Sequence, residues 1–198
     1  MSSYQSSIRR KIRLHRRSLT RQQQQLASQR IAEQLRRHPV YLTSRRIAFF
    51  WPNDGEIDLT RALVESLTKH KHCYLPVLYK GGEDRLLFGR FKDGATLQLN
   101  RFGIPEPNLA RDGWLFAQQL DLVLTPLVAF DDRGNRIGMG GGFYDRSLRQ
   151  LKLPGIWHRP YVLGVAHEFQ HLEHIGRNAW DVPLRGAVTD QRIYQFES

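Results

Sequence analysis

The chain has 198 residues, of which 40% are hydrophobic and 11% aromatic, enough for one globular domain with a sizeable core. It contains no apolar run of membrane-spanning length, no signal-peptide pattern, and a single cysteine that cannot form an intrachain disulfide. We therefore predict a cytoplasmic protein without a membrane segment. The net charge of +11 is uneven, because residues 1–46 carry twelve Lys and Arg and one acidic residue, whereas residues 47–198 carry eighteen of each sign.

The basic segment 1–39 has the pattern of two amphipathic helices that pack through narrow apolar stripes. The expected stripes consist of Ile8, Ile12, His15 and Leu19 in the first helix and Leu26, Ile31 and Leu35 in the second. The arginines expected on the other faces of the first helix are Arg9, Arg10, Arg13, Arg16 and Arg17. Thr20 and Gln23 match a capping box at the start of the second helix, which Pro39 ends. Such a segment can bind nucleic-acid phosphates or hold a small polyanion over a neutral site.

Residues 45–198 alternate between strand and helix patterns. The expected strands are 45–51, 73–78, 86–91, 120–130 and 161–166, with a helix starting at Asp58 and an irregular loop over 101–107. This alternation predicts a single three-layer α/β domain over residues 1–198, with a largely parallel sheet and the basic helices packed against it. Ligands bind at the carboxyl ends of the strands in such sheets, which gathers residues 51–56, 131–145 and 167–168 around one crevice.

The run Gly134–Arg146, G-N-R-I-G-M-G-G-G-F-Y-D-R, stands between a strand and a short helical pattern over 143–151. Glycines let successive N–H groups point into one concavity, and a helix start adds positive potential, so the turn is a candidate phosphate cradle. Arg136 and Arg146 add charge, and Asp145 offers the oxygen ligand that a magnesium ion bridging phosphates needs. The alternative is a turn that only redirects the chain. Neither a P-loop nor a complete G-x-G-x-x-G fingerprint occurs, so the predicted nucleotide site is of another kind.

Two further residues and one motif are candidates for chemistry. Glu56 follows a strand tip, where a carboxylate either holds an amino-heterocycle through paired hydrogen bonds or caps the next helix. Trp51, at the end of the same strand, either stacks on a planar ligand or belongs to the core. Residues 167–171 match the H-E-x-x-H zinc motif, but the motif begins at a strand end and has no clear third ligand. We do not expect zinc hydrolysis.

With D-L-V-L-T-P-L-V-A-F-D before it, the glycine run resembles the signature of the 5-formyltetrahydrofolate cyclo-ligase family, the 5,10-methenyltetrahydrofolate synthetases. The similarity covers nearly the whole chain through R-R-S-L-T, F-W-P-N-D-G-E-I-D, Y-L-P-V-L, F-G-I-P-E-P and W-D-V-P-L. It implies a ligase that uses ATP and Mg²⁺ to convert 5-formyltetrahydrofolate, with or without a polyglutamate tail, to 5,10-methenyltetrahydrofolate, ADP and phosphate. In that reaction ATP phosphorylates the formyl oxygen and the ring then closes.

The resemblance also implies site residues. The positions similar to ATP-binding residues are Arg9, Arg136, Ile137, Gly138, Met139, Gly140, Gly141, Gly142, Phe143 and Tyr144, of which Arg136 and Tyr144 are also expected to be catalytic. Trp51 and Glu56 resemble substrate contacts, and Asp145 resembles the magnesium ligand. Gln5 and Gly141 stand where many members have lysines, and Arg185 stands where some have an acid. The departures at Gly141 and Arg185 weaken the case for a lysine on the γ-phosphate and for a second metal ligand. An RNA-binding protein on a neutral α/β scaffold is the remaining alternative.

Overall fold

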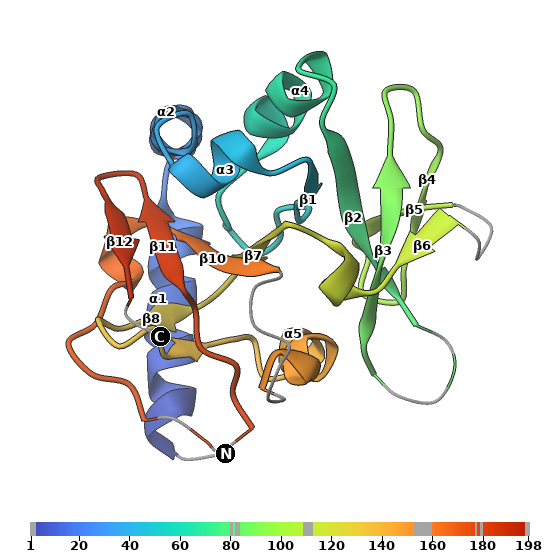
Figure 1. Ribbon diagram of the computed structural model, residues 1–198. Coiled ribbons are helices and arrows are strands. Elements are labelled where there is room, and N and C mark those ends of the chain that lie inside the picture. Colours follow the sequence, from blue (N-terminus) through green and yellow to red (C-terminus); the bar gives the residue numbers. More distant parts are fainter. Residues whose placement is uncertain are drawn as a thin grey trace.

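The computed structural model describes residues 3–79, 81, 84–108, 113–152, 160–176, 178 and 180–196. The largest sheet in these ranges has eight strands in the order β12-β11-β10-β7-β1-β2-β3-β6 (Figure 1). Its parallel strands are β1 (Arg46–Ala48), β2 (His72–Leu78), β7 (Leu122–Pro126), β10 (Tyr161–Ala166) and β11 (Gly186–Thr189). Antiparallel strands complete both edges: β3 (Leu86–Phe91) and β6 (Trp114–Leu115) on one side, β12 (Ile193–Gln195) on the other. The predicted largely parallel sheet is confirmed.

Helices cover both faces of this sheet, because successive side chains of a strand point to opposite sides. Ile47 and Leu122 lie in the core cluster that contains residues of α2 (Arg21–Leu35), α3 (Pro39–Thr43) and α4 (Thr60–Thr68). Their neighbours Ala48 and Val123 lie in a second cluster, together with Leu148 of α5 (Phe143–Leu148). Figure 1 shows α2, α3 and α4 above the sheet and α1 (Ser3–Ser18) and α5 below it. The predicted three-layer α/β arrangement is confirmed.

The N-terminal helices agree with the sequence pattern in outline and differ from it at several residues, among them Leu26 and Arg16. The capping box is present, since Gln23 N donates to Thr20 Oγ1 at 3.2 Å and Thr20 N donates to Gln23 Oε1 at 2.8 Å. The prediction for Leu26 was wrong: its side chain is 45% exposed, and the buried stripe of α2 begins one residue later at Ala27. The prediction for Arg16 was also wrong, because this residue is 1% exposed.

Two segments of the body depart from their predicted form. The expected irregular loop 101–107 contains β5 (Pro105–Pro107), which pairs with β4 (Leu97–Leu99) around a turn. The expected strand 120–130 is interrupted after Pro126, because β8 (Ala129–Phe130) leaves the main sheet and pairs with β9 (Arg136–Ile137). That short hairpin directs the chain back over the end of β7.

Helix boundaries also shift slightly. The helix expected from Asp58 begins at Thr60, whose N–H donates to Asp58 Oδ1 at 2.8 Å. The helical pattern 143–151 is observed as α5 followed by the 3-10 helix Arg149–Lys152. In the part of the chain that the structure describes, no helix has both the length and the apolar character of a membrane span.

Candidate active site

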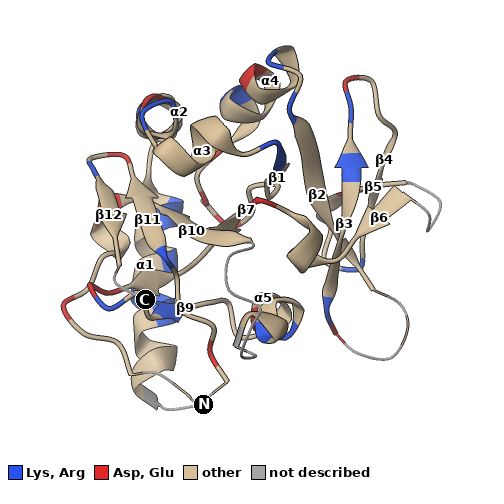
Figure 2. Ribbon diagram, viewed as in Figure 1, with Lys and Arg blue, Asp and Glu red and all other residues tan. Residues whose placement is uncertain are grey.

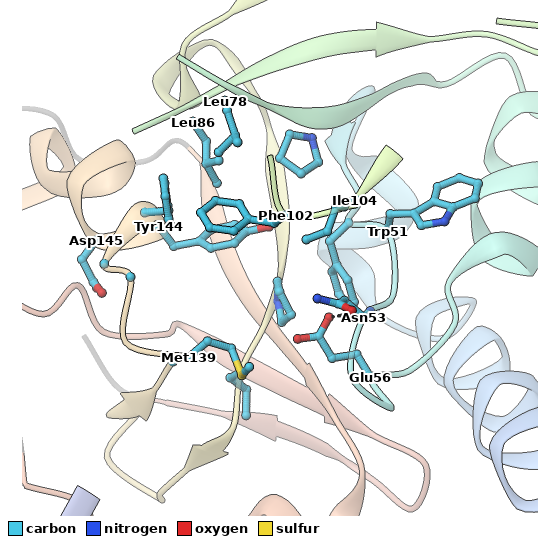
Figure 3. A pocket seen from close by; sticks show the side chains of 18 of the residues that line it. Trp51, Asn53, Glu56, Leu78, Leu86, Phe102, Ile104, Met139, Tyr144 and Asp145 are labelled. Atoms are coloured by element: carbon cyan, nitrogen blue, oxygen red, sulfur yellow. Dashed lines mark hydrogen bonds between the residues drawn. The ribbon is translucent and has the colours of Figure 1, made fainter. Parts of the chain in front are cut away.

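A cavity of about 400 Å³ lies at the carboxyl ends of β1, β2 and β7, within the size range of small-molecule pockets. The order of the strands reverses here, because the chain runs from β1 to β2 on one side and later returns to β7 on the other. Such a switch point is where open α/β sheets bind their ligands. The walls come from residues 50–56 after β1, from the turn between β4 and β5, and from the glycine loop with the start of α5 (Figure 3).

The turn after β1 places Glu56 in the cavity wall. Asp54 and Gly55 have positive φ angles of 53° and 75°, and this sharp reversal lets Asn53 N donate to Glu56 Oε2 at 3.1 Å. Burial raises the pKa of Glu56 to about 7, while the positive charge of Arg16 acts in the opposite direction. A carboxyl group that ionises near neutral pH inside a cleft is typical of functional sites.

The glycine loop forms the opposite wall. Gly140 and Gly142 have φ angles of 104° and 64°, a conformation that glycine adopts without a steric penalty. A Cβ atom added to Gly138 would meet no protein atom within 4 Å, so packing does not demand glycine there and the space is open to a ligand. Arg9 Nε donates to the Gly138 carbonyl oxygen at 2.8 Å, which ties α1 to the loop.

Arg136 and Asp145 form an ion pair beside this loop. Arg136 is only 9% exposed; its Nη2 donates to Asp145 Oδ1 at 2.6 Å and its Nη1 donates to the Val182 carbonyl oxygen. Burial lowers the pKa of Arg136, whereas the charges of Asp145 and Asp181 act to raise it. The Asp145 side chain retains 26% exposure and lines the cavity.

The donor set at this wall fits a magnesium ion. Mg²⁺ in phosphate sites usually keeps several waters and takes one or two carboxylates together with phosphate oxygens. A partly exposed carboxylate at Asp145, next to an open glycine loop, meets that requirement without a second acid.

Tyr144 lies across the cavity from Glu56. Figure 3 shows Tyr144 and Asp145 on one side, with Asn53 and Glu56 on the other. Burial raises the pKa of Tyr144, and the negative charge of Glu56 raises it further. The Tyr144 hydroxyl therefore stays protonated at neutral pH and is available as a hydrogen-bond donor.

The structure brings most of the predicted site residues to this cavity. The predicted residues that line it are Trp51, Glu56, Arg136, Gly138, Met139, Gly141, Gly142, Phe143, Tyr144 and Asp145. Trp51 also packs against the core, and in Figure 3 its indole points away from Glu56, so stacking on a ligand stays a prediction. Ile137 lies in the core at 2% exposure, and neither Gly140 nor Arg9 is among the lining residues.

Residues 167–168, predicted at the same crevice, lie outside it. His167 contacts the carbonyl oxygen of Gly55 at 3.3 Å, behind the turn that carries Glu56. Glu168 turns away and accepts hydrogen bonds from Thr189 and Tyr194. The H-E-x-x-H run is thus a strand end followed by the 3-10 helix Glu168–Gln170, whereas the zinc motif requires an α-helix.

Sequence reasoning missed one wall of the cavity. This wall is the turn between β4 and β5, which contributes Asn100, Phe102 and Ile104. The rings of Phe102 and Phe143 pack edge to face, with 5.7 Å between their centroids. The sequence predicts only an irregular loop over residues 101–107. A signal was available in Phe102 and Ile104, two apolar residues close together in a segment that reads as a surface loop.

Arg185, the residue that replaces an acid of some family members, lies far from the predicted magnesium ligand Asp145. This residue precedes β11, and its guanidinium lies 5.0 Å from the ring of Tyr161, at the first residue of β10. Tyr161 pairs with Leu122, at the start of β7, whereas the cavity is at the end of β7. The substitution of an acid by Arg185 therefore lies at the other end of the strands from Asp145.

Part of the N-terminal positive charge forms ion pairs inside the protein. Figure 2 shows Lys and Arg along α1, which lies below the sheet, as α5 does. Arg13, Arg16 and Arg17 all contact the carboxylate of Asp54. Arg17 is exposed and Arg13 partly exposed, as their place outside the apolar stripe predicts, whereas Arg16 is buried. All three contacts fasten α1 to the turn after β1.

Comparisons with known proteins show the family of this chain. Residues 1–190 match the 5-formyltetrahydrofolate cyclo-ligase family. The 5-formyltetrahydrofolate cyclo-ligase of Escherichia coli K12 is 38% identical over 186 residues, which cover 93% of this chain and 100% of the relative. That of Haemophilus influenzae is 40% identical, covering 89% and 92%. The solution structure of Aquifex aeolicus 5,10-methenyltetrahydrofolate synthetase superimposes with a TM-score of 0.81 at 30% identity, covering 98% and 93%. The chain belongs to the 5-formyltetrahydrofolate cyclo-ligase family.

Proposed function

We propose that the cavity between Glu56 and the glycine loop is where this chain carries out the cyclo-ligase reaction, the ATP-driven conversion of 5-formyltetrahydrofolate to 5,10-methenyltetrahydrofolate. The observation that supports this assignment is the pairing of two unlike walls. One carries a carboxyl group with a pKa near 7, and the other carries an open glycine loop with a carboxylate beside it. The first suits an amino-heterocycle and the second suits the phosphates of Mg-ATP.

The reaction balances with these two substrates alone. The formyl oxygen takes the γ-phosphoryl group of ATP and ADP leaves. The folate nitrogen N10 then attacks the activated formyl carbon and loses its proton. The carbon–oxygen bond breaks, phosphate departs with the former formyl oxygen, and the five-membered methenyl ring is closed.

The residues of the cavity have distinct roles in this proposal. Glu56 in its ionised form accepts two N–H groups of the pterin and fixes the formyl group toward the opposite wall. The N–H groups of the glycine loop bind phosphate oxygens, and Asp145 would hold Mg²⁺, which neutralises phosphate charge when bound. The Tyr144 hydroxyl donates to an oxygen of the transferring phosphoryl group. Preorganised donors of this kind stabilise developing charge without reorganisation.

Arginines outside the reacting centre complete the nucleotide half of the site. Arg136 holds the Asp145 carboxylate through the 2.6 Å contact and adds positive charge to the cavity wall. Arg9 fixes the loop through Gly138 and brings its guanidinium to the edge of the phosphate site. Both side chains therefore support ATP binding rather than a general polyanion surface.

The proposal is tested by following methenyltetrahydrofolate absorbance after mixing the protein with 5-formyltetrahydrofolate, with ATP or Mg²⁺ omitted in turn. We expect product only in the complete mixture, with one ADP formed per methenyltetrahydrofolate. Folded protein that makes no product under saturating Mg-ATP contradicts the proposal. Salt-sensitive binding of RNA stronger than that of ATP would favour the nucleic-acid alternative instead.

A further inference from the structure

Arg16 is a buried charge that the reaction scheme does not use. Its side chain is 0% exposed, although it lies on the basic helix α1. Nη2 donates to Asp54 Oδ2 at 2.8 Å, and Nη1 lies 3.4 Å from the Leu127 carbonyl oxygen and 3.7 Å from Glu56 Oε1. Arg16 thus joins α1, the end of β7 and the turn after β1. A guanidinium is buried at this depth only where partners compensate its charge.

Asp54 has two other cationic partners besides Arg16. Arg13 Nε also donates to Asp54 Oδ2 at 2.7 Å, and Arg17 forms an ion pair with Oδ1. Burial opposes ionisation of Asp54, but hydrogen bonds from the three arginines outweigh it and lower the pKa of Asp54 to about 2. With three cations around one anion, the cluster has excess positive charge next to Glu56.

The groups that face Glu56 act in opposite directions. Burial and the charge of Asp54 favour the protonated acid, whereas Arg16 and the N–H of Asn53 favour the carboxylate. From α5, the Tyr144 hydroxyl faces Glu56 without a charge of its own at neutral pH. Across the cavity, Arg136 and Asp145 are already paired with each other. Among these groups, Arg16 is the cation nearest to the Glu56 carboxyl group.

We propose that Arg16 is a positioning residue of the folate subsite. From its buried place between Asp54 and Glu56 it favours the ionised form of Glu56 and orients that carboxylate toward the cavity. The inference rests on the proposed function, in which Glu56 accepts two pterin N–H groups. A protonated acid carries an O–H donor in place of one acceptor and cannot make that pair. Arg16 therefore links the docking of the N-terminal helix to recognition of the pterin.

The test compares Arg16→Met with Arg17→Met, each of which removes one cation from Asp54. The measurement is kcat/KM for 5-formyltetrahydrofolate at saturating Mg-ATP, from about pH 6 to about pH 9. Loss of an opposite charge raises an acid's pKa by at least about one unit. We expect Arg16→Met to lose about fivefold or more near pH 7, because a pKa one unit higher leaves much less of Glu56 ionised there, and to recover at higher pH, with KM for ATP unchanged. Arg17, with a side chain 55% exposed, contacts Asp54 and not Glu56, so Arg17→Met should keep the wild-type pH profile.

A merely structural role for Arg16 gives a different result. In that case Arg16→Met lowers kcat/KM equally at every pH, or both variants shift the profile alike, and either outcome overturns the inference. Because Arg16 should act through Glu56, adding Arg16→Met to Glu56→Gln should cost little further folate affinity. A full additional loss in the double variant also overturns it.

Direct titration of the Glu56 carboxyl carbon by NMR separates this inference from the proposed function. We expect its pKa to rise in Arg16→Met and stay unchanged in Arg17→Met, whether or not the protein closes the folate ring. If Arg16→Met does not fold, Arg16→Lys serves in its place, with a smaller shift in the same direction. An unchanged Glu56 pKa in the folded variant contradicts the proposed role.

Discussion

Replacing Asp145 with asparagine tests the nucleotide half of the site, because it removes one charge and almost no volume. Asp145 accepts from the guanidinium of Arg136 at 2.6 Å and from Val182 N at 3.2 Å. Hydrogen bonds to charged groups contribute about 1.5–3 kcal/mol, and the amide oxygen of asparagine retains part of each contact. The Val182 carbonyl and Asp181 still partly compensate Arg136. We expect the free energy of unfolding to fall by about 2 kcal/mol, which lowers Tm by about 4–8 °C in a chain of this size.

The same substitution should weaken magnesium binding more than it weakens the fold. An amide oxygen carries no charge and holds Mg²⁺ less well than a carboxylate. We expect the Mg²⁺ concentration for half-maximal rate to rise about tenfold or more, corresponding to about 1.4 kcal/mol or more. Binding of 5-formyltetrahydrofolate should change little, because Glu56 lies on the other wall of the cavity.

Urea denaturation and magnesium titration of the rate measure the two effects, with Asp132→Asn as the control. Asp132 has a side chain 66% exposed and contacts His171, so its substitution should change stability by less than about 1 kcal/mol. An Asp145→Asn variant with wild-type magnesium dependence refutes the metal role. If its folate affinity falls instead, Asp145 belongs to the substrate half of the site.

Three other substitutions or treatments have definite expected results. Arg9→Ala should raise KM for ATP about tenfold, because it removes a charge-assisted contact to Gly138 and to the adjacent phosphate site. The exposed control, Lys11→Ala, should leave KM for ATP unchanged, and equal effects of the two variants would indicate a diffuse charge surface. Gly142→Ala should lower the free energy of unfolding by about 1–2 kcal/mol, since φ is 64° there, and unchanged urea denaturation contradicts this. Burial raises the pKa of Cys73 to about 12, so a thiol reagent near pH 8 should label the protein only after unfolding, and rapid labelling of folded protein would contradict the buried position.

The sheet was predictable where apolar runs are short and bounded by turns. The strands 86–91 and 161–166 were predicted with the limits observed for β3 and β10. The run 120–130 was not resolved into β7 and β8, because the residues of both strands other than Pro126 are buried and no periodicity separates the two halves. The break follows Pro126, which lacks the N–H that a continuing ladder needs.

The site could be predicted where its residues form a motif close together in sequence, or where they match motifs of the family that the chain resembles. The glycine loop and Glu56 were found in this way. Arg16 was missed because a helical pattern assigns every arginine to solvent, whereas its burial depends on Asp54, 38 residues later. The wall formed by the β4–β5 turn was missed because its pairing is set by the neighbouring strands and not by local propensity.

The central step of the proposed chemistry is the contact between the formyl oxygen of the folate and the γ-phosphoryl group of ATP within the cavity. The measurement is the isotope content of the phosphate released when 5-formyltetrahydrofolate carries ¹⁸O in its formyl group. Direct phosphorylation of that oxygen predicts one ¹⁸O atom in each phosphate formed with methenyltetrahydrofolate. Unlabelled phosphate, with ring closure proceeding at the normal rate, would contradict the proposed arrangement of the two substrates.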